Sequence, residues 1–293
     1  MALLDAQTLS RLQGVKLRAR AVVDGVLSGL HKSPHQGQSV EFAEHKEYAP
    51  GDELRHMDWK AYGKFDKYYV KRFEHETNLR GLLVVDASAS MGYKSGELSK
   101  LEVATTLAGA LSYLLVRQQD AAGLAVMTAG KLQDVPPRAS AGHLNMLLES
   151  LERVKPEGTT DLFGAADHLA EVLPRRSLVV VFSDLLDDRQ DALKRILSLR
   201  QRKNDVAVFH LVDPAELTFP FDDPMLFLDM EGDRRVEVNA REIRQSYLEE
   251  FGAFLEGVKT ACAEANVDYE RVRTDERLDE VLLRFLARRG GRK

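Results

Sequence analysis

The segment from Asp86 to Gly92 carries a carboxylate and two hydroxyl groups at a spacing that suits metal binding. It reads Asp-Ala-Ser-Ala-Ser-Met-Gly and follows directly on an apolar run, so that Asp86, Ser88 and Ser90 are each two residues apart. Such side chains can converge on one point if the turn curls around it. One carboxylate with hydroxyl groups is the ligand set of a hard divalent cation that keeps some of its waters. The segment therefore predicts a site for Mg²⁺, or for another hard cation such as Mn²⁺ or Ca²⁺.

Two further polar segments could reach the same point. Residues 158–161 read Gly-Thr-Thr-Asp before a predicted helix, and Ser183-Asp184 ends another apolar run. In open α/β sheets, ligands gather just beyond the carboxyl ends of the strands, so we expect these segments to lie near one another. All their side-chain donors are oxygens. The absence of a thiolate or imidazole among them argues against zinc.

The elements that must position these segments alternate between strands and helices. Continuous apolar runs predict buried strands, and apolar residues recurring at threes and fours predict helices. The predicted strands are 81–85, 122–127, 131–135 (a short edge strand), 177–182, 205–212 and 267–272, with a hairpin at 225–230 and 235–238. The predicted helices are 8–30, 99–119, 141–154, 162–173, 188–202, 240–264 and 276–288. This alternation predicts an α/β fold, a doubly wound and mostly parallel sheet covered by helices on both faces.

Composition narrows the class of protein. The 293 residues correspond to one large domain or two smaller ones, and 41 basic against 46 acidic residues give a net charge of -5. This charge argues against a general nucleic-acid binder. With a single cysteine, Cys262, no signal peptide and no apolar run long enough to span a bilayer, we expect a cytoplasmic protein without a membrane span. Cys262 has no basic sequence neighbour to activate it, which predicts an inert thiol.

Charge and aromatic content divide the chain near residue 80. Residues 1–80 hold 13 basic and 11 acidic residues, and residues 81–293 hold 28 and 35. Eight of the 21 aromatic residues lie within residues 42–73. We therefore expect residues 1–80 to form an N-terminal helix plus a small, loop-rich aromatic and basic module. Residues 81–293 are expected to form the α/β domain, with a hairpin insertion near 225–239.

The predicted metal site resembles the metal-ion-dependent adhesion site of a von Willebrand factor type A domain. The order of elements over residues 81–275 is also similar to that doubly wound, Rossmann-like fold. The first three ligands match the DxSxS motif residue for residue, and the last matches the family's acidic strand-end position. The metal ligands that the resemblance implies are Asp86, Ser88, Ser90, Thr159 and Asp184. Thr160 is the close alternative to Thr159.

Residues upstream of the motif carry a more specific resemblance, which extends over roughly residues 30–290. The sequence is similar to the hallmark segment of the bacterial domain-of-unknown-function 58 family, whose members join that segment to a type A domain. The similar stretches are Glu41–Asp52, Leu54–Lys60 and Tyr68–Glu74. Lys46 stands where the family more often has arginine, and Gly63-Lys64 stands where Ala-Arg is expected. These departures keep the charge but lose bidentate arginine contacts.

The family resemblance implies a function. Members are often encoded beside AAA+ ATPases of the MoxR type and are thought to act as their partners or adaptors. A metal-ion-dependent adhesion site leaves one position of the cation open for an acidic side chain of another protein. The resemblance thus implies a non-enzymatic, Mg²⁺-dependent protein-interaction module, a partner of such an ATPase or of a client protein in protein or complex maturation.

Three alternatives remain open. A Mg²⁺-dependent phosphohydrolase could use Asp86, although such enzymes generally want an acid where Ser88 stands. A scaffold could keep a vestigial metal site and work through residues 36–76. Within those residues, aromatic and basic side chains alternate as in a single-strand nucleic-acid platform, but interspersed acidic residues favour a hydrophobic cluster with a solvated basic edge.

Overall fold

The structure is a computed structural model that describes residues 5–32, 45–47, 69–71, 79–128, 131–187, 189 and 191–290. It contains two compact units, one formed by residues 1–29 with 79–293 and the other by residues 30–78. In the second unit, β1 (His45–Glu47) pairs antiparallel with β2 (Tyr69–Lys71). The remainder of the predicted aromatic and basic module lies outside the described residues. The border predicted near residue 80 stays a prediction.

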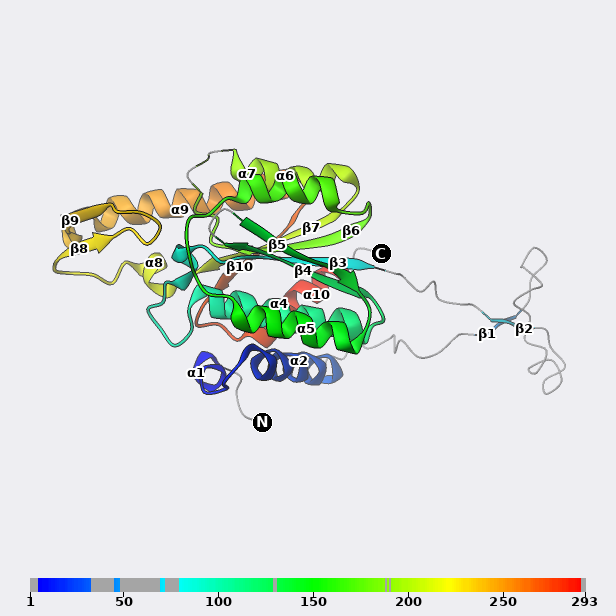
Figure 1. Cartoon of the computed structure of the whole chain (residues 1–293). Coiled ribbons are helices and arrows are strands. Elements are labelled where there is room, and N and C mark those ends of the chain that lie inside the picture. Colours follow the sequence, from blue (N-terminus) through cyan, green and yellow to red (C-terminus); the bar gives the residue numbers. More distant parts are fainter. Residues whose placement is uncertain are drawn as a thin grey trace. The chain divides into compact units, whose positions relative to one another are not determined.

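The larger unit is built on a six-stranded sheet with the order β10-β7-β6-β3-β4-β5 (Figure 1). Neighbouring strands pair in parallel, except that β5 runs antiparallel to β4 at one edge. The strands are β3 (Arg80–Asp86), β4 (Ala121–Thr128), β5 (Lys131–Arg138), β6 (Ser177–Ser183), β7 (Asp205–Val212) and β10 (Asp268–Arg273). The predicted mostly parallel sheet, including its edge strand, is confirmed.

Helices cover both faces of this sheet, which confirms the doubly wound α/β fold (Figure 1). One face carries α4 (Lys100–Arg117), α5 (Ala141–Arg153) and α10 (Leu278–Gly290), with α1 (Ala6–Ser10) and α2 (Val15–Lys32) packed outside them. The other face carries α6 (Leu162–Val172), α7 (Ala192–Ser198) and α9 (Ala240–Glu264). The short elements are η2 (Ala89–Gly92), η3 (Leu199–Arg202), α8 (Pro214–Thr218), β8 (Pro224–Leu228) and β9 (Arg235–Asn239).

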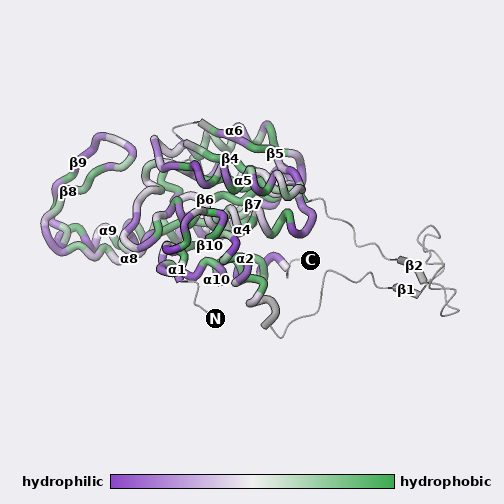
Figure 2. The backbone as a smooth tube through the Cα atoms, turned by 60° about the horizontal axis from the view of Figure 1, so that its bottom comes forward, coloured by the Kyte–Doolittle hydropathy of each residue, from purple (hydrophilic) through white to green (hydrophobic). Residues whose placement is uncertain are grey.

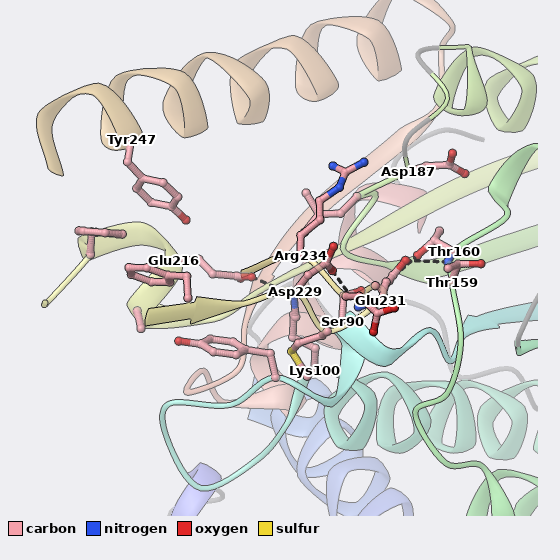
Figure 3. A pocket seen from close by; sticks show the side chains of 18 of the residues that line it. Ser90, Lys100, Thr159, Thr160, Asp187, Glu216, Asp229, Glu231, Arg234 and Tyr247 are labelled. Carbon is pink, nitrogen blue, oxygen red and sulfur yellow. Dashed lines mark hydrogen bonds and ion pairs between the residues drawn. The ribbon is translucent and has the colours of Figure 1, made fainter. Parts of the chain in front are cut away.

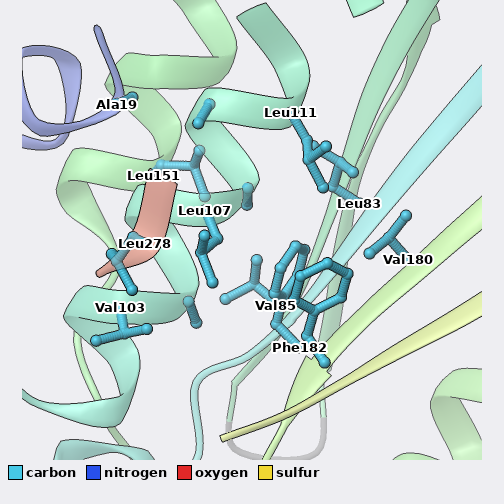
Figure 4. Packing of buried hydrophobic residues seen from close by; sticks show 14 of the residues in the cluster. Ala19, Leu83, Val85, Val103, Leu107, Leu111, Leu151, Val180, Phe182 and Leu278 are labelled. Carbon is cyan, nitrogen blue, oxygen red and sulfur yellow. The ribbon is translucent and has the colours of Figure 1, made fainter. Parts of the chain in front are cut away.

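Two hydrophobic cores follow from the alternation of side chains along the central strands. Leu83 and Val85 of β3 belong to the core under α4, whereas Leu82 and Val84 belong to the core under α6, α7 and α9. In Figure 4, Val85 and Phe182 lie toward Leu107 of α4, and Leu83 lies beside Leu111 of the same helix. Figure 2 shows mainly hydrophobic colours along the central strands and mixed colours on the covering helices. The sheet is therefore buried on both faces, and its carboxyl-end loops carry the polar chemistry.

Three predicted elements can be compared with the structure: the N-terminal helix, the helix after β6 and the hairpin. A continuous helix over residues 8–30 is wrong, because Gly14 adopts φ +91° between α1 and α2, a value that glycine tolerates and other residues rarely adopt. The helix predicted to begin at residue 188 begins at Ala192. The hairpin is confirmed, with Phe227 of β8 opposite Val236 of β9. Among the described helices, none is long and apolar enough to cross a membrane.

Candidate functional site

The predicted ligands lie at the point where the chain changes direction across the sheet. After β3 the chain continues to β4 on one side, and it later returns to β6 on the other side, so β3 lies between them. β3 and β6 pair in parallel with Val85 opposite Phe182, which brings Asp86 at the end of β3 beside Ser183 at the end of β6. Such switch points form crevices in which α/β proteins bind ligands.

The turn after β3 has the curled form under which the side chains of the motif can converge. Ser88 N–H donates a hydrogen bond to Asp86 Oδ1 at 3.0 Å, and the 3₁₀ turn η2 follows at once. The hydroxyl oxygens of Ser88 and Ser90 lie 3.1 Å apart. The structure therefore brings the carboxylate and both hydroxyl groups of the motif together.

Asp86 is fully buried, with 0% of its surface exposed. Ser183 Oγ donates to Asp86 Oδ2 at 2.6 Å, and within the described part of the chain both partners of this carboxylate are neutral donors. Burial and then the charge of Asp184 raise the pKa of Asp86 to about 7. A buried carboxylate without a cation is unfavourable, so this position would be stabilised by a bound positive charge.

Asp184 lies in a different environment because a buried lysine neutralises it. Lys100 Nζ lies 2.7 Å from Asp184 Oδ2 and 2.9 Å from Glu216 Oε1. Burial by itself would lower the pKa of Lys100, but the two carboxylates raise it above its ordinary value. Lys100 therefore stays charged. The sequence analysis gave Lys100 no role. The capping box formed by Ser99 and Glu102 is the signal that makes Lys100 the first residue of α4.

The loop that carries the two threonines is fixed beside the motif by backbone hydrogen bonds. Ala89 N–H donates to Gly158 O, and Glu157 N–H donates to Ala87 O, each at 2.9 Å. Thr160 donates through its N–H and its Oγ1 to the Glu231 carboxylate at 2.9 and 3.0 Å. Glu231 comes from the loop between β8 and β9 and lies beside the two threonines in Figure 3, and the sequence analysis gave it no functional role. No described hydrogen bond joins either threonine to Asp86.

A cavity of about 660 Å³ opens beside the motif and contains Ser90, Thr159 and Thr160 in its wall. Its volume falls within the usual range for ligand sites, about 300–1,000 Å³. The polar end lies near the threonines and Glu231, while Tyr247 reaches into the cavity from α9 (Figure 3). Aromatic side chains from the loop after α8, from β8 and from α9 form the other end, and these are Phe219, Phe221, Phe227 and Tyr247.

The donor set suits a hard cation by its chemistry. The described residues contain no group of three or more His, Cys, Asp or Glu side chains that could hold a metal ion. A site made from Asp86, serine and threonine hydroxyls and the nearby Asp184 depends instead on mixed carboxylate and hydroxyl oxygens. Such a set fits an ion that keeps several waters, as Mg²⁺ does. The five predicted ligands remain a prediction.

Sequence comparison connects this chain to proteins without an assigned role. A family model described as "Protein of unknown function DUF58" matches residues 44–253. An uncharacterized protein from Mycobacterium tuberculosis is 27% identical over 219 residues, which cover 74% of this chain and 68% of that protein. The family match therefore spans more than half of the chain.

Solved structures with a similar arrangement have low sequence identity. The protein BatB from Bacteroides thetaiotaomicron has a TM-score of 0.45 and 15% identity, covering 73% of this chain and 99% of that one. The VWA domain of SpRpn10 has a TM-score of 0.39 and 10% identity, covering 70% of this chain and 93% of that one.

Proposed function

This chain belongs to the DUF58 family of proteins of unknown function, and from that premise we propose that it is a non-enzymatic, Mg²⁺-dependent protein-interaction module. In this proposal the cation binds at the carboxyl ends of β3 and β6. The residues that would hold it are Asp86, Ser88, Ser90, Thr159 and Asp184. Thr159 is favoured over Thr160 because the Thr160 hydroxyl already donates to Glu231, whereas Thr159 is exposed in the cavity.

The buried Asp86 carboxylate is the observation that carries the proposal. It accepts hydrogen bonds from Ser88 and Ser183 but meets no cation in the described residues, and Asp184 lies close enough to raise its pKa. Removing a charge from water is costly unless an opposite charge compensates it. A divalent cation would supply that charge, and the Ser88 and Ser90 hydroxyl oxygens lie where they could share in binding it.

Asp184 would contribute in a different way from Asp86. Lys100 holds its Oδ2, and Leu186 N–H donates to its Oδ1 at 3.2 Å. These contacts fix the orientation of the carboxylate, whose charge still acts on Asp86 next to it. In the proposal, Asp184 therefore adds negative charge and an oriented oxygen to a site whose principal ligand is Asp86.

The cation would make the interaction with another protein specific for an acidic side chain. A hard cation with few protein ligands keeps exchangeable positions, and a carboxylate is a preferred oxygen ligand for such a position. We propose that the carboxylate comes from an AAA+ ATPase of the MoxR type or from a client protein handled with it. The cavity beside Ser90 would receive the residues that flank this acidic side chain.

Binding to a purified MoxR-type ATPase from the same genome tests the proposal. A chelator is unsuitable because the ATPase itself requires Mg²⁺ with its nucleotide, so the comparison uses variants of this chain. Asp86→Asn should weaken binding at least about tenfold, which corresponds to roughly 1.4 kcal/mol. Asp24→Asn removes the same charge from an exposed position of α2 and should leave binding unchanged. Equal binding by wild type and Asp86→Asn would contradict the proposal.

A further inference from the structure

The cavity beside the motif has a wall with an excess of negative charge. Five carboxylates line it, against only two basic side chains, those of Lys100 and Arg234. The ammonium group of Lys100 is already engaged by Asp184 and Glu216. The cavity would therefore attract a positively charged group and repel an acidic one unless a metal ion intervened.

Most of these carboxylates are held in place without being neutralised. Asp187 accepts a hydrogen bond from the backbone N–H of Leu162, and Asp229 accepts one from the N–H of Glu231. Glu231 itself accepts from Thr160. Across the part of the chain that the structure describes, no ion pair involves Asp187, Asp229, Glu231 or the fifth carboxylate, Asp233. Neutral donors fix the positions of Asp187, Asp229 and Glu231, and Asp233 is exposed, so the charges of all four remain available.

The opposite wall consists of aromatic rings that pack against one another. The ring centroids of Phe219 and Tyr247 lie 4.6 Å apart, and Phe219 stacks on Phe227 at 5.8 Å. A further ring on the wall, that of Tyr93, already accepts a cation over its face, because Lys100 Nζ lies 5.9 Å from its centroid. Aromatic faces attract cations, and this attraction strengthens when the cation is partly removed from water. The cavity thus combines fixed carboxylates with rigid aromatic surface.

We propose that this cavity binds an arginine side chain of a partner protein. A guanidinium group is planar, stacks on aromatic rings and donates two parallel hydrogen bonds to a carboxylate, so it matches both walls. In the proposal, the carboxylates of Asp229 and Asp233 accept hydrogen bonds from the guanidinium group. The ring of Tyr247 contacts the aliphatic part of the arginine side chain and stacks on the guanidinium plane. The cavity volume of about 660 Å³ exceeds one side chain, and exposed Leu186 and Met230 on its wall suit aliphatic residues next to the arginine.

This site is separate from the proposed metal function because it needs no metal ion. Its ligand is a cation, whereas the strand-end site is proposed to take an acidic side chain through Mg²⁺. The two sites lie side by side, so a single partner segment could engage both. A measurement made without divalent metal isolates the arginine site.

The test measures binding of three labelled pentapeptides to the full chain by fluorescence polarisation, in EDTA at low salt. The peptides are acetyl-Gly-Leu-X-Leu-Gly-amide, with X as arginine, its uncharged isostere citrulline, or glutamate. We expect the arginine peptide to bind at least about tenfold more tightly than either other peptide, because only guanidinium makes charge-assisted hydrogen bonds with the wall. Equal binding of the arginine and citrulline peptides, or no binding of the arginine peptide, would overturn the proposal.

Matched variants locate the binding site. Asp229→Asn keeps the oxygen that accepts from Glu231, and Asp233→Asn alters an exposed side chain, so melting temperatures should match wild type. Each variant should weaken arginine-peptide binding several-fold, whereas Asp24→Asn and Asp86→Asn should not. Loss of binding to the same degree in Asp24→Asn would show only a general charge effect and would refute the site. If Asp86→Asn still binds the arginine peptide, the arginine site does not depend on the proposed metal site, and the two proposals can fail independently.

Discussion

Lys100 Nζ and Asp184 Oδ2 form an ion pair of 2.7 Å in which only 1% and 2% of the two side chains are exposed. Lys100 begins α4, Asp184 follows β6, and Glu216 of α8 completes the group. Because of this pair, the two neighbouring acids Asp184 and Asp86 have different electrostatic environments. Asp184 receives a cation from the protein itself, whereas Asp86 is a buried carboxylate whose described hydrogen-bond partners, Ser88 and Ser183, are neutral.

Replacing Lys100 by methionine should destabilise the fold strongly. The change keeps the aliphatic stem but leaves Asp184 and Glu216 without their shared cation, and breaking a buried pair in this way costs about 3–5 kcal/mol. Urea unfolding should show this loss in the free energy of unfolding. Lys194→Met, at an exposed position of α7, is the matched control and should change stability little. Equal stability of the two variants would mean that the pair contributes nothing.

Replacing Glu231 by alanine should loosen the hairpin formed by β8 and β9. The change removes both hydrogen bonds from Thr160, and losing about 1 kcal/mol of local stability corresponds to roughly fivefold faster amide exchange. Hydrogen–deuterium exchange should therefore accelerate in residues 224–239 and at Thr160, while the central strands keep their protection. Glu237→Ala, an exposed change on β9, should leave exchange as in wild type. Unchanged exchange in Glu231→Ala would contradict a stabilising role for the hydrogen bonds between Thr160 and Glu231.

Cys262 should be inert in the native protein. Burial raises its pKa to about 12, so very little thiolate forms at pH 8, and its side chain is shielded within the core under α9. A disulfide reagent should react at pH 8 only after denaturation, whereas Ser246→Cys at an exposed position of α9 should react at once. Because the folded pKa is the higher one, the contribution of this thiol to stability should fall as the pH rises above about 9. Rapid native labelling of Cys262 would contradict this account.

The parts of the structure that depend on local sequence could be predicted. The apolar run before Asp86 predicts a buried strand, and it forms β3 in the middle of the sheet. The spacing of Asp86, Ser88 and Ser90 lets their side chains converge if the turn curls. The turn does bring the Asp86 carboxylate to Ser88 N–H and the Ser88 hydroxyl to that of Ser90. Both features arise within about ten residues of chain, so periodicity and spacing contain the needed information.

Features that depend on distant parts of the chain were missed. Lys100 begins a helix, where lysine is ordinarily exposed, and its burial follows from two carboxylates 84 and 116 residues away. Glu231 lies in a predicted hairpin turn, but its partner Thr160 is 71 residues distant. The break between α1 and α2 depends on the positive φ of Gly14, which apolar periodicity does not register. These contacts are decided by tertiary packing.

Isothermal titration of Mg²⁺ into the purified chain tests the central claim most directly. Wild type and Asp24→Asn should bind one ion per chain with the same affinity, and Asp86→Asn should bind at least about tenfold more weakly, because it lacks the principal charged ligand. Equal heats from wild type and Asp86→Asn, or no Mg²⁺ binding by wild type, would contradict a cation site at the ends of β3 and β6.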